Sequence, residues 1–496
     1  EKRPLVKVRD NDEKINKDKG NEELFSNFRK SIARRTRGFL APEYNIQCVE
    51  AAVNKQFDEG IKVERGLFTK LMTGSQSAAQ RYAFFSERQA NKVPDISKDE
   101  SIKEIKKVGV IGAGTMGGGI SMNFANVGIP ITIIEQNEER LEKGISVIRR
   151  NYENTAKKGR ISENDVETRM GLINGQTSLD SLNDCDLIIE AVFENMELKK
   201  DIFKQLDSIA KEGAILASNT SALNVNEIAA ETSRPEDVIG LHFFSPANVM
   251  RLLEIVRGER TSKSVVASSL AIAKKINKIA AVVGVCPGFV GNRILAQRQR
   301  EANKLILEGA LPWEIDDALY NFGFPMGPFA MSDLAGLDIG WNKETSKGET
   351  LRDLLCEAGR LGQKSGKGFY LYDENRNKSP DPEVEQIIRD FAEARQIRLR
   401  DVTKEEILER CLYPMINEGF KILEEGMAIR ASDIDVVWVY GYGWPIYEGG
   451  PMFYGSLIGF DKILERLKKM EEEFGPDFTP SPYLERVVEE KINIFA

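Results

Sequence analysis

A group of glycines directly after a short apolar run constrains the fold of this chain more than any other feature. Gly112-Ala113-Gly114-Thr115-Met116-Gly117 has the spacing GxGxxG and follows the apolar run at 108–111. Further apolar runs at 131–134 and 187–189 are separated by amphipathic stretches of helical period. Strands that alternate with helices predict a parallel sheet covered on both faces. We expect this α/β region to span residues 104–285.

The glycine spacing in this position is typical of a dinucleotide-binding site. It allows a tight turn and then a bare backbone, so that a pyrophosphate can approach the outward-pointing amides of a helix N-terminus. Glu135 ends the second predicted strand, 23 residues after Gly112 (135 − 112). A carboxylate there accepts hydrogen bonds from a ribose 2′-hydroxyl and repels a 2′-phosphate, which favours NAD over NADP. The alternatives are a plain glycine-rich turn and a solvated charge at the end of a strand.

The composition is that of a soluble globular protein, with 41% hydrophobic and 29% charged residues. A chain of 496 residues is too long for one hydrophobic core, so several domains are expected. The net charge of -8 argues against a nucleic-acid partner, and no apolar run is long enough to span a bilayer. The five cysteines are widely spaced and there is one histidine, so we expect neither a disulfide framework nor a metal site.

The rest of the chain has a mainly helical pattern. Residues 1–20 are highly charged and indicate a solvated tether, and residues 21–103 indicate helices followed by a linker. Downstream, three landmarks occur twice in the same order: Ile306-Leu307-Glu308-Gly309, Ile315-Asp316 and Gly323-Phe324-Pro325, then Ile422-Leu423-Glu424-Glu425-Gly426, Ile434-Asp435 and Gly443-Trp444-Pro445. The repeat distance of 120 residues (445 − 325) predicts two related helical domains, at 286–385 and 386–496. The expected fold is α/β plus all-α: a Rossmann-type domain, two tandem helical domains and a helical N-terminal segment.

The single histidine, His242, ends an apolar segment that a parallel strand would deliver to the carboxyl edge of the sheet, where ligands bind. Imidazole suits the removal of a hydroxyl proton during hydride transfer from a carbinol. Glu254 is a carboxylate inside an apolar stretch, and its burial without a partner would be costly. A pair with His242 would fix the tautomer and stabilise the imidazolium. The alternative is a core histidine and an exposed strand glutamate.

Five motifs in order resemble the 3-hydroxyacyl-CoA dehydrogenase family. They are the glycine motif, the His242 segment, Glu190-Ala191-Val192-Phe193-Glu194-Asn195, Ser218-Asn219-Thr220-Ser221 and Gly288-Phe289-Val290-Gly291-Asn292-Arg293. The resemblance implies that His242 and Glu254 are catalytic and that Ser221 and Asn292 contact the substrate. It places Glu194 and Lys199 beside the nicotinamide, and we expect Asn219 to join the glycine motif and Glu135 in the cofactor site.

The wider chain resembles the C-terminal part of the multifunctional β-oxidation enzymes, the peroxisomal type 1 form and its bacterial relatives. Segments 34–38, 57–60 and 362–370 carry this wider match, together with the tandem helical domains. The resemblance implies NAD-dependent oxidation of L-3-hydroxyacyl-CoA to 3-ketoacyl-CoA in fatty acid β-oxidation. It also implies that residues 21–103 are left from a hydratase domain. Because the chain starts at Glu1, after the hydratase core, we interpret it as a fragment or processed chain whose hydratase activity is in doubt.

Three expectations concern partners and location. Lys157, Lys158 and Arg160 form a basic cluster that could meet the CoA phosphates, with a solvated helix face as the alternative. The duplicated helical domain could replace the dimer partner of single-function relatives, which favours a monomer. We interpret Tyr440, Tyr442 and Trp444 as core packing. The C-terminus is not a peroxisomal tripeptide, so a bacterial-type cytoplasmic location is the default and a peroxisomal one the alternative.

Two rival functions remain open at this point. The first is a β-hydroxyacid dehydrogenase for a substrate without CoA, a class that tends to use a lysine as the acid–base. The second is a catalytically inactive NAD-binding scaffold. The pairing of His242 with Glu254 argues against the first rival, and the intact set of Ser221, His242, Glu254 and Asn292 argues against the second.

Overall fold

The computed structural model describes residues 7, 9 and 11–495. The chain forms two compact units, each discontinuous in sequence. Unit 1 takes the chain up to Phe84, Ala302–Leu408 and Trp444–Gly449, and unit 2 takes Phe85–Glu301, Glu409–Gly443 and Gly450–Ala496. Among the described residues, no helix is long and apolar enough to cross a membrane.

Unit 2 is built on an eight-stranded sheet with the strand order β3-β2-β1-β4-β5-β6-β7-β8. The strands are β1 (Val108–Ile111), β2 (Ile131–Ile134), β3 (Ile173–Gln176), β4 (Leu187–Glu190), β5 (Ile215–Ser218), β6 (Val238–Phe243), β7 (Leu252–Val256) and β8 (Ile279–Val283). All neighbouring strands are parallel except β6 and β7, which are antiparallel. The first six strands follow the order of a dinucleotide-binding fold. The predicted Rossmann-type sheet is therefore confirmed.

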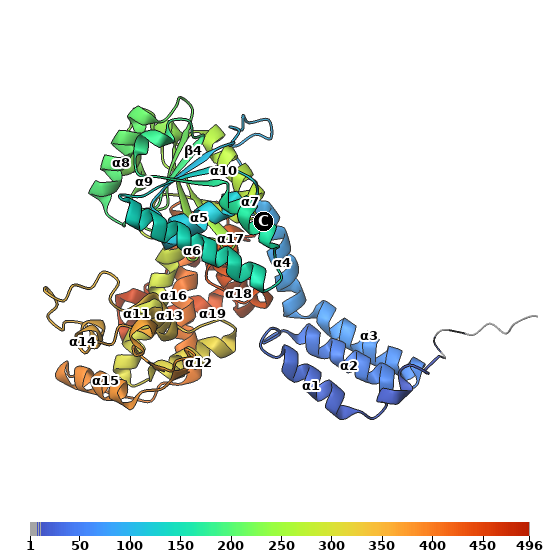
Figure 1. The fold of residues 1–496 in the computed structure, drawn as a ribbon. Coiled ribbons are helices and arrows are strands. Elements are labelled where there is room, and N and C mark those ends of the chain that lie inside the picture. Colours follow the sequence, from blue (N-terminus) through green and yellow to red (C-terminus); the bar gives the residue numbers. More distant parts are fainter. Residues whose placement is uncertain (1–6, 8, 10, 496) are drawn as a thin grey trace, which may run out of the picture. The chain divides into compact units, whose positions relative to one another are not determined.

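Helices cover both faces of this sheet (Figure 1). One apolar core joins alternate strand residues to α5 (Thr115–Ala125), α6 (Glu138–Lys157), α7 (Glu163–Met170) and α10 (Lys263–Lys275). Strand residues of the other parity face away from this core, towards α8 (Met196–Ile209) and α9 (Val225–Ala229). Because successive side chains of a strand point to opposite faces, His242 and Glu254 lie on the second face.

The helices that complete unit 2 come from both ends of the chain. They are the C-terminal part of α4 (Ser75–Ala90), the first residues of α11 (Gly291–Glu308), most of α16 (Lys404–Glu424), and α17 (Ala431–Gly441), α18 (Pro451–Ile458), α19 (Phe460–Phe474) and α20 (Pro482–Glu490). Helix α17 packs against β7 and β8. This contact brings part of the second helical repeat to the strand that carries Glu254.

Unit 1 is helical. It contains α1 (Glu22–Ile32), α2 (Leu40–Asn54), α3 (Phe57–Thr73), α12 (Pro312–Phe322), α13 (Pro328–Ala335), α14 (Leu351–Glu357), α15 (Pro382–Ala394) and the short ribbon of β9 (Leu371–Tyr372) and β10 (Lys378–Ser379). Arg37 links the N-terminal helices to α12, because its guanidinium donates to the Phe324 carbonyl (2.7 Å) and lies over the Tyr320 ring. Trp444 packs edge-on against Phe322 and Phe324.

The two helical repeats share one internal feature. In the first repeat, the Asp316 carboxylate accepts the first backbone N–H groups of α13, from Phe329 (3.0 Å) and Ala330 (2.9 Å). In the second repeat, the Asp435 carboxylate accepts the corresponding groups of α18, from Met452 and Phe453. Both aspartates are buried, so each satisfies helix-end donors that water cannot reach. The predicted duplication is therefore visible as a repeated helix cap.

Candidate active site

The glycine motif forms a close turn at the carboxyl end of β1. Gly112 has φ +101°, and a Cβ there would lie 2.7 Å from the Ala191 carbonyl oxygen. A Cβ at Gly117 would lie 1.8 Å from the Gly112 oxygen, whereas a Cβ at Gly114 would meet nothing within 4 Å. Thr115 then opens α5, with Met116 as its second residue. An open, exposed backbone at the start of a helix fits the pyrophosphate of a dinucleotide.

Glu135 lies beside this turn, as the sequence predicts. Its carboxylate accepts hydrogen bonds from the N–H groups of Ala113 (3.0 Å) and Gln136 (2.8 Å). The acid is therefore fixed at the end of β2, at the edge of the glycine turn. The ribose of a dinucleotide lies at this position in Rossmann-type sites, and a 2′-phosphate would meet the negative charge.

His242 and Glu254 form a cross-strand pair on the antiparallel strands β6 and β7. The register sets them directly opposite each other, and His242 Nδ1 lies 2.7 Å from Glu254 Oε2. Glu254 is 0% exposed and His242 6% exposed, so the alternative of an exposed strand glutamate is wrong. The second oxygen of Glu254 accepts the N–H of Gly291 (2.9 Å), at the start of α11. Since Nδ1 faces the carboxylate, Nε2 is left to exchange a proton.

Aromatic rings flank the imidazole. The ring centroid of Phe244 lies 4.5 Å and that of Phe289 5.8 Å from that of His242. Phe289 is buried and has φ 49°, a left-handed backbone conformation at the turn that leads into α11. Such strain persists only where the surroundings enforce it. The turn brings Gly291 and Asn292 to the His242–Glu254 pair.

Ser221, Asn292 and Glu194 are joined by hydrogen bonds. Glu194 Oε1 accepts from Thr220 Oγ1 (2.7 Å), the Ser221 N–H (2.8 Å) and Ser221 Oγ (3.1 Å), while Asn292 Nδ2 donates to the Ser221 carbonyl (3.2 Å). Burial raises the pKa of Glu194, but these hydrogen bonds and the charge of Lys199 outweigh it and lower the pKa overall. The carboxylate is therefore ionised and holds the Ser221 hydroxyl as a donor.

Asn219 and Lys199 stabilise the residues around this network. Asn219 Oδ1 accepts the N–H of Phe243, which ties the end of β5 to β6. Lys199 is only 1% exposed, and its Nζ lies 2.6 Å from Glu190 Oε1 and 3.4 Å from Glu194 Oε2. The structure therefore buries Lys199, and its ion pair with Glu194 is its contact with this network.

Sequence reasoning gave no role to Glu190, which organises the end of β4. Its carboxylate accepts from Lys199 Nζ, from Ser218 Oγ (2.6 Å) and from the Val192 N–H (2.8 Å). The residue is fully buried. An acidic residue that closes an apolar strand was the available signal, because such a charge needs partners.

The basic cluster lies apart from these groups. Lys157 ends α6, and Lys158 and Arg160 follow it, all three exposed. Helix α6 starts at Glu138, just after the carboxyl end of β2, and 20 residues of helix span about 30 Å. The cluster therefore lies at the far end of α6 from the carboxyl edge of β2.

The three aromatic residues of the second repeat have different environments. Trp444 packs among rings of unit 1, and Tyr440 donates its hydroxyl to Glu87 Oε2 (2.8 Å). Tyr442, by contrast, donates its hydroxyl to Asn292 Oδ1 (2.8 Å). The interpretation of Tyr442 as core packing alone therefore missed a contact with a predicted site residue.

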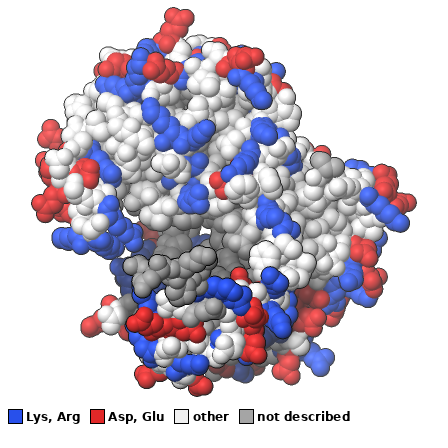
Figure 2. Space-filling view, turned by 90° about the vertical axis from the view of Figure 1, so that its right-hand side faces the viewer, with Lys and Arg blue, Asp and Glu red and all other residues white. Residues whose placement is uncertain are grey.

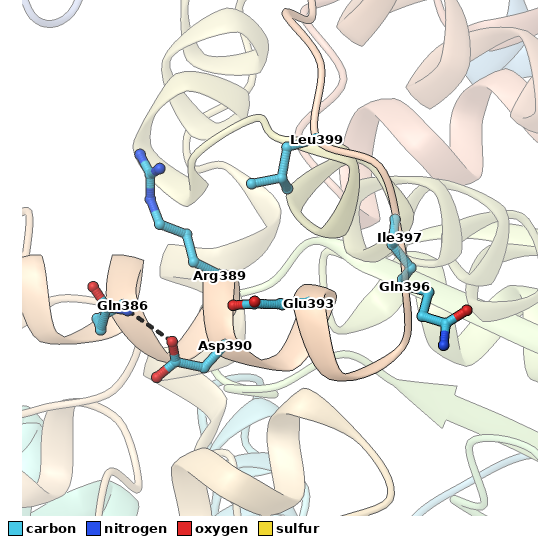
Figure 3. Close-up of a pocket in the computed structure, with 7 residues that line it drawn as sticks. All are labelled: Gln386, Arg389, Asp390, Glu393, Gln396, Ile397 and Leu399. Atoms are coloured by element: carbon cyan, nitrogen blue, oxygen red, sulfur yellow. Dashed lines mark hydrogen bonds between the residues drawn. The ribbon is translucent and has the colours of Figure 1, made fainter.

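Figure 2 shows the distribution of charge over one face, and Figure 3 shows a hollow whose lining contains none of the predicted catalytic residues. On the face in Figure 2, basic and acidic side chains are intermingled. A hollow in unit 1, drawn in Figure 3, is lined by residues of α15 and by 396–399, with Gln386 donating to Asp390 (2.7 Å). Among the described residues, no group of three or more His, Cys, Asp or Glu side chains is placed to hold a metal ion.

Comparison with known families matches most of the chain. The NAD binding domain of 3-hydroxyacyl-CoA dehydrogenase matches residues 107–286. The C-terminal domain of the same family matches twice, at 288–372 and 407–493. The two matches fall on the two helical repeats.

Curated relatives and solved structures agree with the family match. The peroxisomal bifunctional enzymes of Cavia porcellus and Homo sapiens are each 42% identical to this chain, over 94% of it and 68% of their own length. The dehydrogenase part of multifunctional enzyme 1 from C. elegans is 32% identical, with a TM-score of 0.62 over 83% of this chain and 99% of that one. For 3-hydroxybutyryl-CoA dehydrogenase from Escherichia coli K12 the values are 25%, 0.67, 78% and 99%. The chain is an NAD-dependent oxidoreductase that belongs to the 3-hydroxyacyl-CoA dehydrogenase family.

Proposed function

We propose that this chain oxidises L-3-hydroxyacyl-CoA to 3-ketoacyl-CoA in fatty acid β-oxidation, with His242 as the acid–base. The observation that carries the proposal is the buried His242–Glu254 pair at 2.7 Å. Glu254 accepts the N–H of Gly291, and the next residue, Asn292, donates to Ser221. A buried carboxylate that holds one imidazole nitrogen leaves the other free for proton transfer.

Each residue of the site has a separate role in the proposed oxidation. His242 Nε2 takes the proton of the substrate 3-hydroxyl, and Glu254 stabilises the imidazolium that results. When bound, NAD supplies the acceptor for the hydride from C3. Asn292 Nδ2 uses one N–H for the Ser221 carbonyl, so its second N–H is available to the oxygen that becomes the ketone. Ser221 donates its hydroxyl hydrogen to Glu194, so its oxygen is left as an acceptor.

The test follows NADH absorbance with acetoacetyl-CoA as the substrate. The parent should oxidise NADH rapidly and NADPH slowly, because Glu135 repels a 2′-phosphate. His242→Gln should lose about 10²–10⁴-fold in kcat. Near-parental turnover by His242→Gln, with normal NADH binding, would contradict the assignment of the base.

Glu254→Gln is the matched variant in the same assay. A glutamine can still accept the Gly291 N–H, but its amide would donate to His242 Nδ1 and place the imidazole hydrogen on Nε2. We expect a loss of kcat similar to that of His242→Gln, because reduction of the ketone needs an imidazolium that donates its Nε2 proton, and a glutamine does not stabilise that charge. Unchanged kcat in Glu254→Gln would show that the carboxylate does not stabilise the imidazolium.

The rival functions correspond to other outcomes of this assay. Turnover of free 3-hydroxy acids with little activity on the thioesters would favour a dehydrogenase for substrates without CoA. NADH binding without oxidation across short and long 3-ketoacyl-CoAs would favour a scaffold. The lysine base typical of the first rival lacks a counterpart at the described site, since Lys199 is held by Glu190.

We further propose that Lys157, Lys158 and Arg160 contact the CoA phosphates. Their exposure at the end of α6 supports access, and their distance from the start of that helix counts against it. Replacement of all three by alanine should raise KM for acetoacetyl-CoA without changing kcat. An unchanged KM would leave the cluster as a solvated helix face.

We propose that this chain is a monomer, because two reciprocal ion pairs join its two repeats to each other. Arg293 pairs with Glu418 (2.6 Å), and Arg410 pairs with Glu301 (2.9 Å). Both residues of the second repeat stand 117 positions after their counterparts (410 − 293 and 418 − 301). Mutual contacts of this kind are typical of a two-fold dimer interface, here within one chain. Sedimentation equilibrium should give the mass of one chain, 55.6 kDa.

Three earlier expectations stay predictions: the absence of hydratase activity, the cytoplasmic location and the absence of a nucleic-acid partner. The relatives are named as bifunctional and peroxisomal, and this chain spans 68% of their length. Hydration of a 2-enoyl-CoA by this polypeptide would contradict the first expectation.

A further inference from the structure

A tyrosine of the second helical repeat contacts the substrate-side asparagine on α11. Tyr442 is the residue that caps the C-terminus of α17, and its hydroxyl lies 2.8 Å from Asn292 Oδ1. Asn292 is the second residue of α11. The two residues are 150 positions apart in the sequence. The second repeat therefore reaches a group that the proposed mechanism uses.

The hydrogen bonds around Asn292 determine which way its amide faces. The Ser221 carbonyl can only accept, so the amide nitrogen must face it. The amide oxygen then faces Tyr442, whose hydroxyl must be the donor. With these two contacts made, one N–H of Asn292 remains for a third group.

The surroundings of Tyr442 hold its hydroxyl in place. Its ring stacks on Trp438 (4.4 Å between centroids, 21° between planes) and meets the Phe244 ring edge-on (5.2 Å). A Cβ at Gly291 would lie 2.5 Å from the hydroxyl oxygen, so this close approach needs a glycine there. Burial, followed by the nearby charge of Glu254, raises the pKa of Tyr442 well above its ordinary value. The hydroxyl therefore stays protonated and remains a donor.

The first repeat lacks this hydroxyl. Phe322 stands 120 residues before Tyr442 (442 − 322), ahead of the same Gly-aromatic-Pro sequence. Packing alone is therefore satisfied by a phenyl ring at the matched position of the other copy. The hydroxyl occurs in the copy whose helix α17 packs on β7, the strand of Glu254.

We propose that Tyr442 is a positioning residue for the dehydrogenase reaction. Its hydroxyl fixes the amide of Asn292 so that the free N–H is presented to the substrate C3 oxygen. This inference rests on the proposed role of Asn292. A second helical repeat without its own dinucleotide domain thereby contributes to catalysis through one hydrogen bond.

The test is Tyr442→Phe in the complete chain, with acetoacetyl-CoA and NADH as substrates. The variant keeps the ring and restores the residue of the first repeat. We expect kcat to fall about tenfold, the value of one hydrogen bond, with NADH affinity and melting temperature unchanged. Tyr440→Phe is the matched control on the same helix, because its hydroxyl bonds Glu87, and it should leave kcat unchanged.

A double-mutant cycle separates positioning from packing. Asn292→Ala alone should lower kcat, and adding Tyr442→Phe to it should cause no further loss, because the hydroxyl acts through the amide. A full additional loss in the double variant would overturn the inference, as would a parental kcat in Tyr442→Phe. Parental kcat in Asn292→Ala would instead remove the proposed role of Asn292, and the positioning role with it.

Discussion

The two helical repeats have the same aspartate caps at their helix ends but differ at the matched position where α12 and α17 end, Phe322 in the first repeat and Tyr442 in the second. Asp316 and Asp435 cap the following helix in the same way, and Gly327 and Gly450 leave room for them, since a Cβ would lie within 2.4 Å of the aspartate. By contrast, the hydroxyl of Tyr442 has no counterpart at Phe322. Both repeats therefore share the residues that a helix end requires, whereas the second has a hydroxyl that reaches Asn292, a predicted site residue.

A second difference lies one helix further on. In the first repeat the buried Asp333 carboxylate accepts the N–H groups of Phe369 (2.9 Å) and Tyr370 (3.1 Å), and thereby anchors the segment after α14. The second repeat has Ser456 at the matched place, five residues after its proline as Asp333 is after Pro328. The first repeat thus carries an additional anchored segment that the second one lacks.

The largest effect should come from the reciprocal ion pairs of the repeats. The side chains of Arg410 and Glu301 are both 0% exposed, whereas those of Arg293 and Glu418 are 16% and 9% exposed. Arg410→Met should lower the free energy of unfolding by about 3–5 kcal/mol, because it removes the guanidinium that pairs with the buried Glu301 carboxylate at 2.9 Å. Arg293→Met should cost about 1–2 kcal/mol. Urea unfolding measures both.

The control for this prediction removes both charges. Arg410→Met combined with Glu301→Gln should recover part of the loss, since no buried carboxylate charge then remains at this position. Equal losses in Arg410→Met and Arg293→Met would show that the two pairs are equivalent, and that burial does not separate them.

The paired helix caps allow one substitution to be compared in both copies. Asp316→Ala and Asp435→Ala each remove the carboxylate that accepts two buried or partly buried backbone N–H groups, so each should cost about 2–4 kcal/mol in urea unfolding. Only Asp435→Ala should also lower kcat, because Asp435 lies on α17 and Tyr442 caps the C-terminus of that helix. An equal loss of kcat in both variants would mean that the copies do not differ in their link to the site.

The smallest effect concerns pH and the segment found in the first repeat alone. Burial raises the pKa of Asp333 to about 6, against the opposing hydrogen bonds of the Phe369 and Tyr370 N–H groups. An unfolded aspartate titrates near pH 3.9, so this residue stabilises the folded state fully below that pH. The contribution is lost as pH rises through about 6, and the part lost between pH 4 and pH 7 amounts to about 2 kcal/mol.

Asp333→Asn tests that sign. The variant does not titrate, so its stability deficit relative to the parent should shrink by about 2 kcal/mol between pH 4 and pH 7. Ser456→Ala in the second repeat is the matched control and should show a deficit that does not change with pH. A constant deficit in Asp333→Asn would mean that the carboxyl keeps an ordinary pKa in the folded chain.

The parts of the site that the sequence predicted are those fixed by nearby residues. The glycine turn and Glu135 belong to one strand–helix–strand unit, so a strand, three glycines and an acid in register define them. His242 and Glu254 are 12 residues apart on neighbouring strands, and the cost of burying an unpaired carboxylate pointed to their contact. Period and turn signals likewise predicted the parallel strands of the sheet, but they did not show that β7 runs antiparallel to β6. The duplicated helices were predicted from landmarks that recur in the same order.

Tertiary packing decided the contacts between residues distant in the sequence. An aromatic residue at the end of an apolar helix has the same pattern whether it fills a core or donates to Asn292, so Tyr442 could not be told from Trp444. Lys199 has the sequence pattern of a surface lysine. In the structure it is buried and donates to Glu190 at the end of β4. The sequence alone determined which side chains are present for the proposed reaction, such as the imidazole of His242 and the carboxylate of Glu254. The packing of α17 against β7 and β8, and the hydrogen bond from Gly291 to Glu254, decided which atoms those groups face. A hydrogen bond depends on ångström distances that no local pattern records.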